Sequence, residues 1–175
     1  MIERERALTS VGVLFLFSNY LIIKIMNTDF IVAEVELSYR NRVPYKDRKK
    51  VVSSEDAYNI LLNNHDDDTI DFTETFKVLY LNHSSQVVGC KTLSTGGITA
   101  TCVDVRNIMQ GALLTNATAM VLAHNHPSGN TRPSREDDKI TNQVVKAGEL
   151  LNIKVFDHII YTREHFYSYN DEGRI

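Results

Sequence analysis

The chain has 175 residues, of which 43% are hydrophobic and 23% are charged, and its formal net charge is −3 at pH 7. These values are ordinary for one globular domain with a substantial buried core, and the sequence contains neither internal repeats nor a low-complexity tract. The small negative charge gives no global attraction to nucleic acid or to an anionic membrane, so such binding would need a local patch of cations.

An apolar run lies near the N-terminus. Residues 11–25, VGVLFLFSNYLIIKI, are nearly uncharged but fall short of the roughly twenty residues that a membrane-spanning helix needs. We therefore expect no stable membrane span. A signal peptide is disfavoured, because the preceding MIERER balances two acids against two arginines and no small-residue cleavage site follows. Met26 offers a second start, so residues 1–25 are interpreted as an N-terminal extension that need not belong to the native domain, with an ordinary buried apolar segment as the alternative.

A strand, a basic segment and a short helix are expected next. Residues 31–39 alternate apolar and polar side chains, which predicts a strand with one wet face. Residues 40–50, RNRVPYKDRKK, carry six cations in eleven positions. We interpret them as a solvated linker, with a nucleic-acid or protein contact as the alternative. Ser53 or Ser54 predicts a helix start, and the apolar stripe of that helix would be Ala57, Ile60 and Leu61.

The rest of the chain alternates strands with helices. Helices are expected from a cap at Asp104 to about Leu114, with Leu113 on the buried face, and from Ser134 to about Leu151, with Leu150 and Leu151 buried. Strands are expected at residues 76–81, 86–93, 98–103, 118–123, 153–161 and 166–169. The first two form a hairpin, and a helical crossover can join parallel strands. The prediction is therefore an α/β (α+β) domain, a mixed β-sheet flanked by helices.

The two cysteines, Cys90 and Cys102, fall within two of the expected strands. They are too few for a disulfide framework and are not spaced for a zinc knuckle. We therefore expect small core residues and a reducing, cytoplasmic location.

A histidine pair follows the expected strand at residues 118–123. Alternate side chains of a strand point to the same face, so His124 and His126 can present both imidazoles to one point. Eleven residues after the second histidine, Asp137 would lie in the first turn of a helix capped by Ser134, and this turn can face the strand end.

Two imidazole nitrogens and one carboxylate oxygen form the ligand set of a three-ligand catalytic zinc site, with a fourth position left for water. Asp138 could take the ligand role in place of Asp137, but its side chain would point about 100° further round the helix. The alternative is a metal-free turn that precedes a serine-capped helix.

The stretch HNHPSGNTRPSRED fits H-x-H-x7-S-x2-D, the JAMM signature of JAB/MPN-domain metalloproteins. With FDHIIY and YSYNDEGRI downstream, the chain resembles the RadC-like branch of bacterial JAB domains over roughly residues 72–175, and more weakly from about residue 26. It is similar to members without the N-terminal helix-hairpin-helix module. The expected organisation is an extension at residues 1–25, a strand and basic linker at 26–52, and the JAB/MPN RadC-like domain at 53–175.

The resemblance implies a zinc-dependent hydrolase of peptide or isopeptide bonds, with one Zn²⁺ per chain held by His124, His126 and Asp137. The family uses a glutamate at the start of its first strand, where TETFKVLYL places Glu74 as general base. An acid at the edge of an apolar strand suits this role, and a solvated strand-end residue is the alternative. Ser134 would stabilise the oxyanion.

Two other functions are carried as alternatives. One is a metal-stabilised interaction module or DNA-repair-associated protein without peptidase activity. The other is a DNA-acting hydrolase, for which residues 40–50 are the only support. His158 is expected to be buried and hydrogen-bonded behind the ligands. His65, His83 and His165 are expected to be solvated, and Asn125 and Ser128 are assigned to turn geometry.

Overall fold

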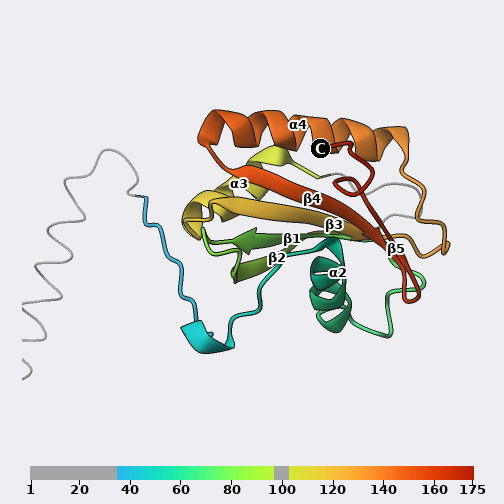
Figure 1. Cartoon of the computed structure of the whole chain (residues 1–175), viewed down its shortest axis with the longest axis horizontal. Coiled ribbons are helices and arrows are strands. Elements are labelled where there is room, and N and C mark those ends of the chain that lie inside the picture. Colours follow the sequence, from blue (N-terminus) through green and yellow to red (C-terminus); the bar gives the residue numbers. More distant parts are fainter. Residues whose placement is uncertain (1–34, 97–102) are drawn as a thin grey trace, which may run out of the picture. The chain divides into compact units, whose positions relative to one another are not determined.

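A single five-stranded sheet forms the centre of the domain. The computed structural model describes residues 35–96 and 103–175, and Ser38–Ile175 forms one compact unit. The strand order is β2-β1-β3-β4-β5 (Figure 1). Only the pairing of β3 with β4 is parallel, and every other neighbouring pair is antiparallel. The expected mixed sheet is confirmed, with strands β1 (Thr75–Leu81), β2 (Val87–Thr95), β3 (Ala119–Asn125), β4 (Lys154–Tyr161) and β5 (Phe166–Ser168).

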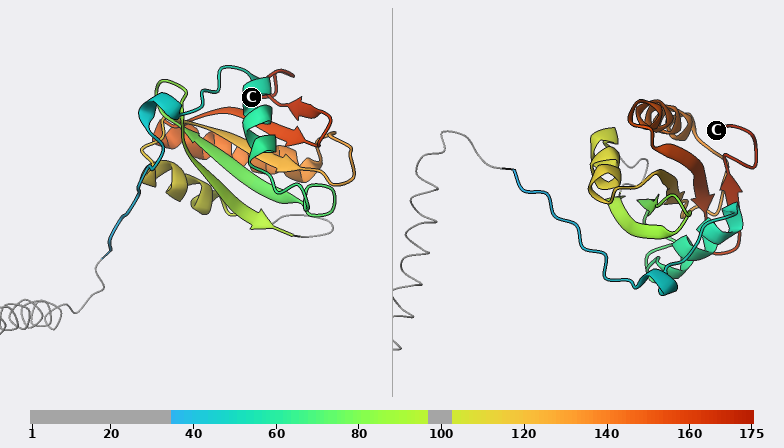
Figure 2. Two further views of the ribbon diagram at one scale, coloured as in Figure 1. Left: turned by 90° about the horizontal axis from the view of Figure 1, so that it is seen from below. Right: turned by 60° about the vertical axis from the view of Figure 1, so that its left-hand side comes forward.

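Helices cover both faces of this sheet. Helices α3 (Val105–Leu114) and α4 (Arg135–Leu151) lie on one face and α2 (Ser54–Asn63) on the other (Figures 1 and 2). A short 3₁₀ turn, η1 (Tyr45–Asp47), precedes α2. Strand β3 serves both cores by alternation: Met120 and Leu122 pack under α3 and α4, whereas Val121 and Ala123 pack with α2. The same alternation sends His124 to the α4 face and Asn125 to the α2 face.

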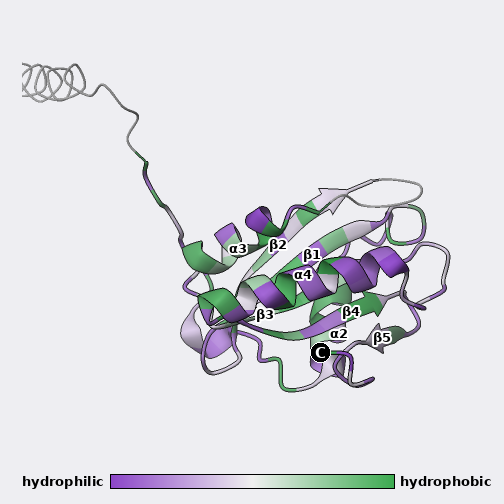
Figure 3. Cartoon of the chain, turned by 90° about the horizontal axis from the view of Figure 1, so that it is seen from above, coloured by the Kyte–Doolittle hydropathy of each residue, from purple (hydrophilic) through white to green (hydrophobic). Residues whose placement is uncertain are grey.

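The helix starts agree with the sequence. Ser53 and Ser134 each form a full capping box, with Asp56 and Asp137 respectively, and Asp104 caps α3. Helix α4 ends at Leu151, followed by Asn152 in the left-handed conformation. Figure 3 shows that α4 is hydrophilic over its N-terminal part and more hydrophobic toward its C-terminal end. The helix therefore begins, at its polar end, beside the histidine pair.

The strand expected at residues 31–39 is wrong where it can be compared. Residues 31–34 lie outside the described residues, and residues 35–39 form no strand. Val35 and Leu37 are 80% and 79% exposed. Alternation predicts a strand only where a core receives the apolar face, and among the described residues these side chains meet none. The strand expected at 98–103 and the apolar run at 11–25 also fall on residues that the structure leaves undescribed, apart from Val103.

Several residues expected in the core are exposed. Leu113 and Leu150 are 56% and 84% exposed, and Leu151 is exposed as well. The buried line of α4 runs through Thr141, Val144 and Gly148, and a residue two positions beyond it is turned about 200° away. Cys90 is exposed on the edge strand β2, and Cys102 lies outside the described residues. No helix within residues 35–96 and 103–175 is long and apolar enough to cross a membrane.

Candidate metal centre

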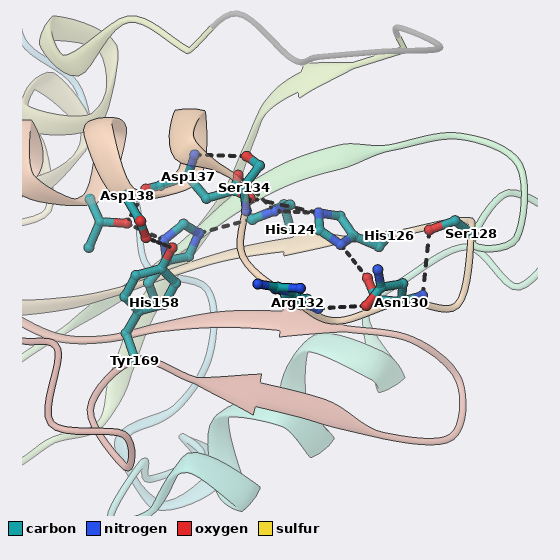
Figure 4. Close-up of polar contacts among 11 residues, drawn as sticks. His124, His126, Ser128, Asn130, Arg132, Ser134, Asp137, Asp138, His158 and Tyr169 are labelled. Atoms are coloured by element: carbon teal, nitrogen blue, oxygen red, sulfur yellow. Dashed lines mark hydrogen bonds and ion pairs between the residues drawn. The ribbon is translucent and has the colours of Figure 1, made fainter.

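The three predicted ligands come together where β3 ends and α4 begins. His124 is the penultimate residue of β3, His126 follows the strand, and Asp137 lies in the first turn of α4 (Figure 4). The candidate ligand atoms of these residues all lie within 4.8 Å of one another. Nε2 of His124 is 3.0 Å from Nε2 of His126 and 3.1 Å from Oδ1 of Asp137. The loop thus returns the carboxylate to the histidine pair.

A chain of hydrogen bonds determines the tautomer of His124. The Thr141 hydroxyl donates to the main-chain oxygen of Asp137, so its oxygen must accept from Nδ1 of His158, 2.6 Å away. Nε2 of His158 therefore carries a lone pair, and it lies 2.9 Å from Nδ1 of His124. His124 consequently donates through Nδ1 and keeps a lone pair on Nε2, the atom that faces the cluster.

His126 also carries its proton on Nδ1 and a lone pair on Nε2, because of a separate contact. Its Nδ1 lies 2.6 Å from the main-chain oxygen of Asn130, which can only accept, so Nδ1 carries the proton. Two Nε2 lone pairs and a carboxylate then face one another, an arrangement that a bound cation stabilises.

The spacing of these atoms also suits a metal. Ligands about 2.0–2.1 Å from a tetrahedral zinc are about 3.3 Å apart. The separations of 3.0 Å and 3.1 Å at His124 are close to this value, whereas His126 Nε2 lies 4.0 Å from the second carboxylate oxygen, Oδ2, of Asp137. The donor set therefore fits a metal ion such as zinc in number and chemistry.

Burial strengthens this electrostatic arrangement. His158 is completely buried between the rings of Phe76 and Tyr169, and this burial is the main cause that lowers its pKa well below the ordinary value. His158 is therefore a neutral hydrogen-bonding partner behind the ligands, as expected. Burial acts to raise the pKa of Asp137, but in the absence of a metal a proton on Nε2 of His124 and the contacts from Ser134 outweigh it and lower this pKa below its usual range. Asp137 is thus held as a carboxylate.

Ser134 and Asp138 have different surroundings, although both begin α4. The Ser134 hydroxyl oxygen accepts from the Asp137 amide at 3.1 Å, and the Ser134 amide donates to Oδ2 of Asp137 at 2.7 Å. The cap uses the hydroxyl as an acceptor, so its hydrogen remains available for donation. Asp138 instead binds the hydroxyl of Tyr169 and the guanidinium of Arg174. Asp138 therefore contacts the C-terminal segment, and Asp137 is the carboxylate that joins the histidines.

Glu74 lies on the same side of the sheet as the histidines. Strand β1 pairs with β3 so that Phe76 is opposite His124, and the same antiparallel register, continued by two residues, brings Glu74 opposite His126. Both residues line one cavity of about 510 Å³. The structure therefore places the predicted general base in the same cavity as His126, and Glu74 is not part of the ligand cluster itself.

Asn125, which the sequence assigned to turn geometry, has a different position. It ends β3 fully buried, with its side chain on the α2 side of the sheet. Its Oδ1 accepts from the Thr75 amide at 2.8 Å, and its Nδ2 donates to the main-chain oxygens of Ile70 and Thr73 at 2.7 Å and 2.9 Å. The segment that carries Glu74 is thereby bound to the end of β3.

Comparison with known proteins gives the family. Residues 51–174 match the model of the RadC-like JAB domain. The chain belongs to this family. A UPF0758 protein of Flavobacterium johnsoniae is 42% identical over 149 residues, which are 82% of this chain and 62% of that protein. UPF0758 proteins YfjY and YeeS of Escherichia coli are 44% and 45% identical over 100 residues, 57% of this chain and 62% and 68% of those proteins. The chain spans less than two thirds of the first two relatives.

In this RadC-like domain, sequence reasoning missed the groups that orient the ligands. Thr141 and Asn130 fix the two imidazoles, and neither carries a motif; only the position of Thr141, one helical turn after Asp137, is a usable signal. The expectation of a solvated His65 is wrong: its Nδ1 lies 2.8 Å from the buried hydroxyl of Tyr161. His83 is exposed, as expected, and His165 is exposed with a contact to Thr162.

Proposed function

We propose that this RadC-like domain is a zinc-dependent metallohydrolase of the JAMM type that cleaves peptide or isopeptide bonds. The observation that carries the proposal is the convergence of His124, His126 and Asp137, with both Nε2 lone pairs and the carboxylate facing one point. Zinc held by these residues would lower the pKa of a coordinated water from 15.7 to about 7 and polarise a substrate carbonyl.

The protein's own groups would supply the proton transfers. Glu74 is partly buried and faces the cavity that also reaches His126, so its carboxylate can accept a proton from the attacking water. The same carboxylate would then deliver this proton to the leaving amine. Ser134 would donate its hydroxyl hydrogen to the oxygen that becomes negative, because its N-cap contact uses only a lone pair.

A cleavage screen with a matched variant tests this function. Zinc-loaded protein is incubated with libraries of peptides and of isopeptide-linked peptides, and products are identified by mass spectrometry. We expect wild-type protein to cleave a subset, and Glu74→Gln to retain zinc while its rate falls by at least about a hundredfold. Cleavage that is unchanged in Glu74→Gln would remove this residue from the mechanism. Bound zinc without any cleavage would favour the metal-stabilised interaction module instead.

A further inference from the structure

The cavity beside the candidate metal centre has a mixed lining. It measures about 510 Å³, reaches Glu74 and His126, and extends along the loop that joins β3 to α4 as far as Arg132. On its other side lies Phe72, whose side chain is 71% exposed. A substrate whose carbonyl reaches the histidines would place its neighbouring groups in this cavity. The lining residues therefore determine which neighbouring groups are accepted.

Arg132 is the only cation among the residues that line the cavity. In the part of the chain that the structure describes, its guanidinium makes no hydrogen bond or ion pair. Its backbone is nevertheless held, because the Arg132 amide donates to Oδ1 of Asn130 at 3.0 Å and Pro133 follows. Of the two acids that line the cavity, Asp71 is paired with Arg163 at 2.7 Å. Arg132 is thus a positioned cation that is available to a ligand.

Phe72 supplies an apolar surface from a segment that is also held in place. Asn125 binds the main-chain oxygens of Ile70 and Thr73, on either side of this residue. The Phe72 amide donates to the main-chain oxygen of Thr69 at 3.2 Å. An exposed aromatic ring on a fixed backbone can bind an apolar group with little loss of conformational entropy.

We propose that this cavity binds a carboxylate-bearing residue of a peptide substrate, with Arg132 bound to the carboxylate and Phe72 packed against the adjoining apolar part. This inference rests on the proposed function, because it names the substrate class of the same site. The planar guanidinium matches a carboxylate through two parallel hydrogen bonds. The carboxylate comes either from an acidic side chain or from the peptide C-terminus.

The charges of the cavity favour a peptide over a nucleic acid. A nucleic-acid strand brings a series of phosphates and needs several cations along its path. Here one arginine shares the lining with two acids, Asp71 and Glu74. One carboxylate can pair with one guanidinium, whereas the further phosphates of a nucleic acid would be repelled by the negative charges of these two acids.

Binding is measured with zinc-loaded full-length Glu74→Gln protein, so that cleavage does not remove the ligand. Fluorescent peptides differ at one scanned position, which is Glu, Gln or Lys, and each is made with a free or an amidated C-terminus. Fluorescence anisotropy gives the dissociation constants. We expect the Glu peptides, or those with a free C-terminus, to bind about tenfold more tightly than their neutral counterparts.

Four further variants make the test specific. Arg132→Gln should abolish the preference for the carboxylate, and Arg132→Glu should shift it toward Lys. Arg135→Gln, which removes an exposed cation outside the cavity, should leave the preference unchanged. Phe72→Ala should weaken binding of every peptide.

The inference is overturned if no peptide binds, if charged and neutral peptides bind alike, if Arg132→Gln keeps the preference, or if a single-stranded oligonucleotide binds more tightly than any peptide. Arg132-dependent binding by a wild-type protein that cleaves none of the bound peptides would contradict the proposed hydrolase and leave this subsite intact.

Discussion

Asn125 binds the backbone on both sides of Glu74: its carboxamide accepts from the amide of Thr75 and donates to the main-chain oxygen of Thr73. Asn125 is also the middle residue of the H-x-H pair, and its side chain leaves the strand on the opposite face from the imidazoles. One short stretch of β3 therefore presents two candidate ligands to one face and fixes the backbone of the candidate base from the other.

Asn125→Ala should reduce hydrolysis by at least about tenfold while zinc content stays unchanged, because the ligands remain and Glu74 loses its fixed backbone. Two buried polar groups and one partly buried group would lose their partner, so the free energy of unfolding should fall by about 2–4 kcal/mol. Rates, metal content and hydrogen exchange of residues 70–75 are measured together. Asn82→Ala is the control, since Asn82 makes comparable contacts at the distant β1–β2 turn. Equal loss of activity in both variants would show a general effect of instability.

Thr141→Val keeps the shape of the side chain but removes the hydroxyl that accepts from His158. The tautomers of His158 and His124 are then no longer fixed, and we expect zinc affinity to fall by about tenfold. Competition with a chromophoric chelator measures this change. Thr115→Val removes a similar hydroxyl at the C-cap of α3, far from the site, and should leave affinity unchanged. Unaltered affinity in Thr141→Val would refute the hydrogen-bond chain as a determinant of metal binding.

Ser134→Gly separates the two roles of this serine. Glycine at an N-cap costs only a few tenths of a kcal/mol, so the melting temperature should change little. The oxyanion donor is lost, and we expect the hydrolysis rate to fall by about a hundredfold. Ser53→Gly, in the matching capping box of α2, should have the same small effect on stability and none on the rate. A variant with the wild-type rate would eliminate Ser134 as the oxyanion donor.

His65 should make stability depend on pH. Burial, followed by the charge of Lys77, lowers its pKa to about 4 from an ordinary value of 6.5. Above pH 6.5 the residue is neutral in both states, whereas between pH 6.5 and 4 the unfolded chain binds the proton more readily. Stability should therefore decline as the pH falls through this range, and His158, whose pKa is lowered too, adds to the decline. Urea unfolding with chelator present measures the slope, which His65→Gln should reduce; an identical slope in this variant would contradict the assignment.

The parts predicted well from the sequence depend on neighbours close in the chain. A capping box requires only Ser134 and Asp137, and the distance from His126 to Asp137 requires only one loop and one helix start. Alternation along β3 likewise predicts the shared face of His124 and His126. These local patterns were sufficient to predict that the candidate ligands lie close together.

The parts that were missed depend on groups distant in the chain. Asn125 acts on Ile70, Thr73 and Thr75, about fifty residues earlier, and no local pattern reveals such a contact. His65 likewise contacts the hydroxyl of Tyr161, which is distant in the chain, so its partial burial could not be predicted from its neighbours in the sequence. Conversely, residues 35–39 alternate like a strand, but the side chains of Val35 and Leu37 are exposed and meet no core among the described residues. Local sequence patterns therefore do not show which distant residues will pack against a segment.

Zinc analysis of the purified protein tests the metal centre most directly. Elemental analysis, with zinc titration of metal-free protein, compares wild type with His126→Ala and with His83→Ala, which removes an exposed histidine in a turn. We predict about one zinc per chain in wild type and in His83→Ala, and a loss of most of it in His126→Ala. Wild-type protein that neither contains nor takes up zinc, or His126→Ala protein that binds it equally well, would contradict the account.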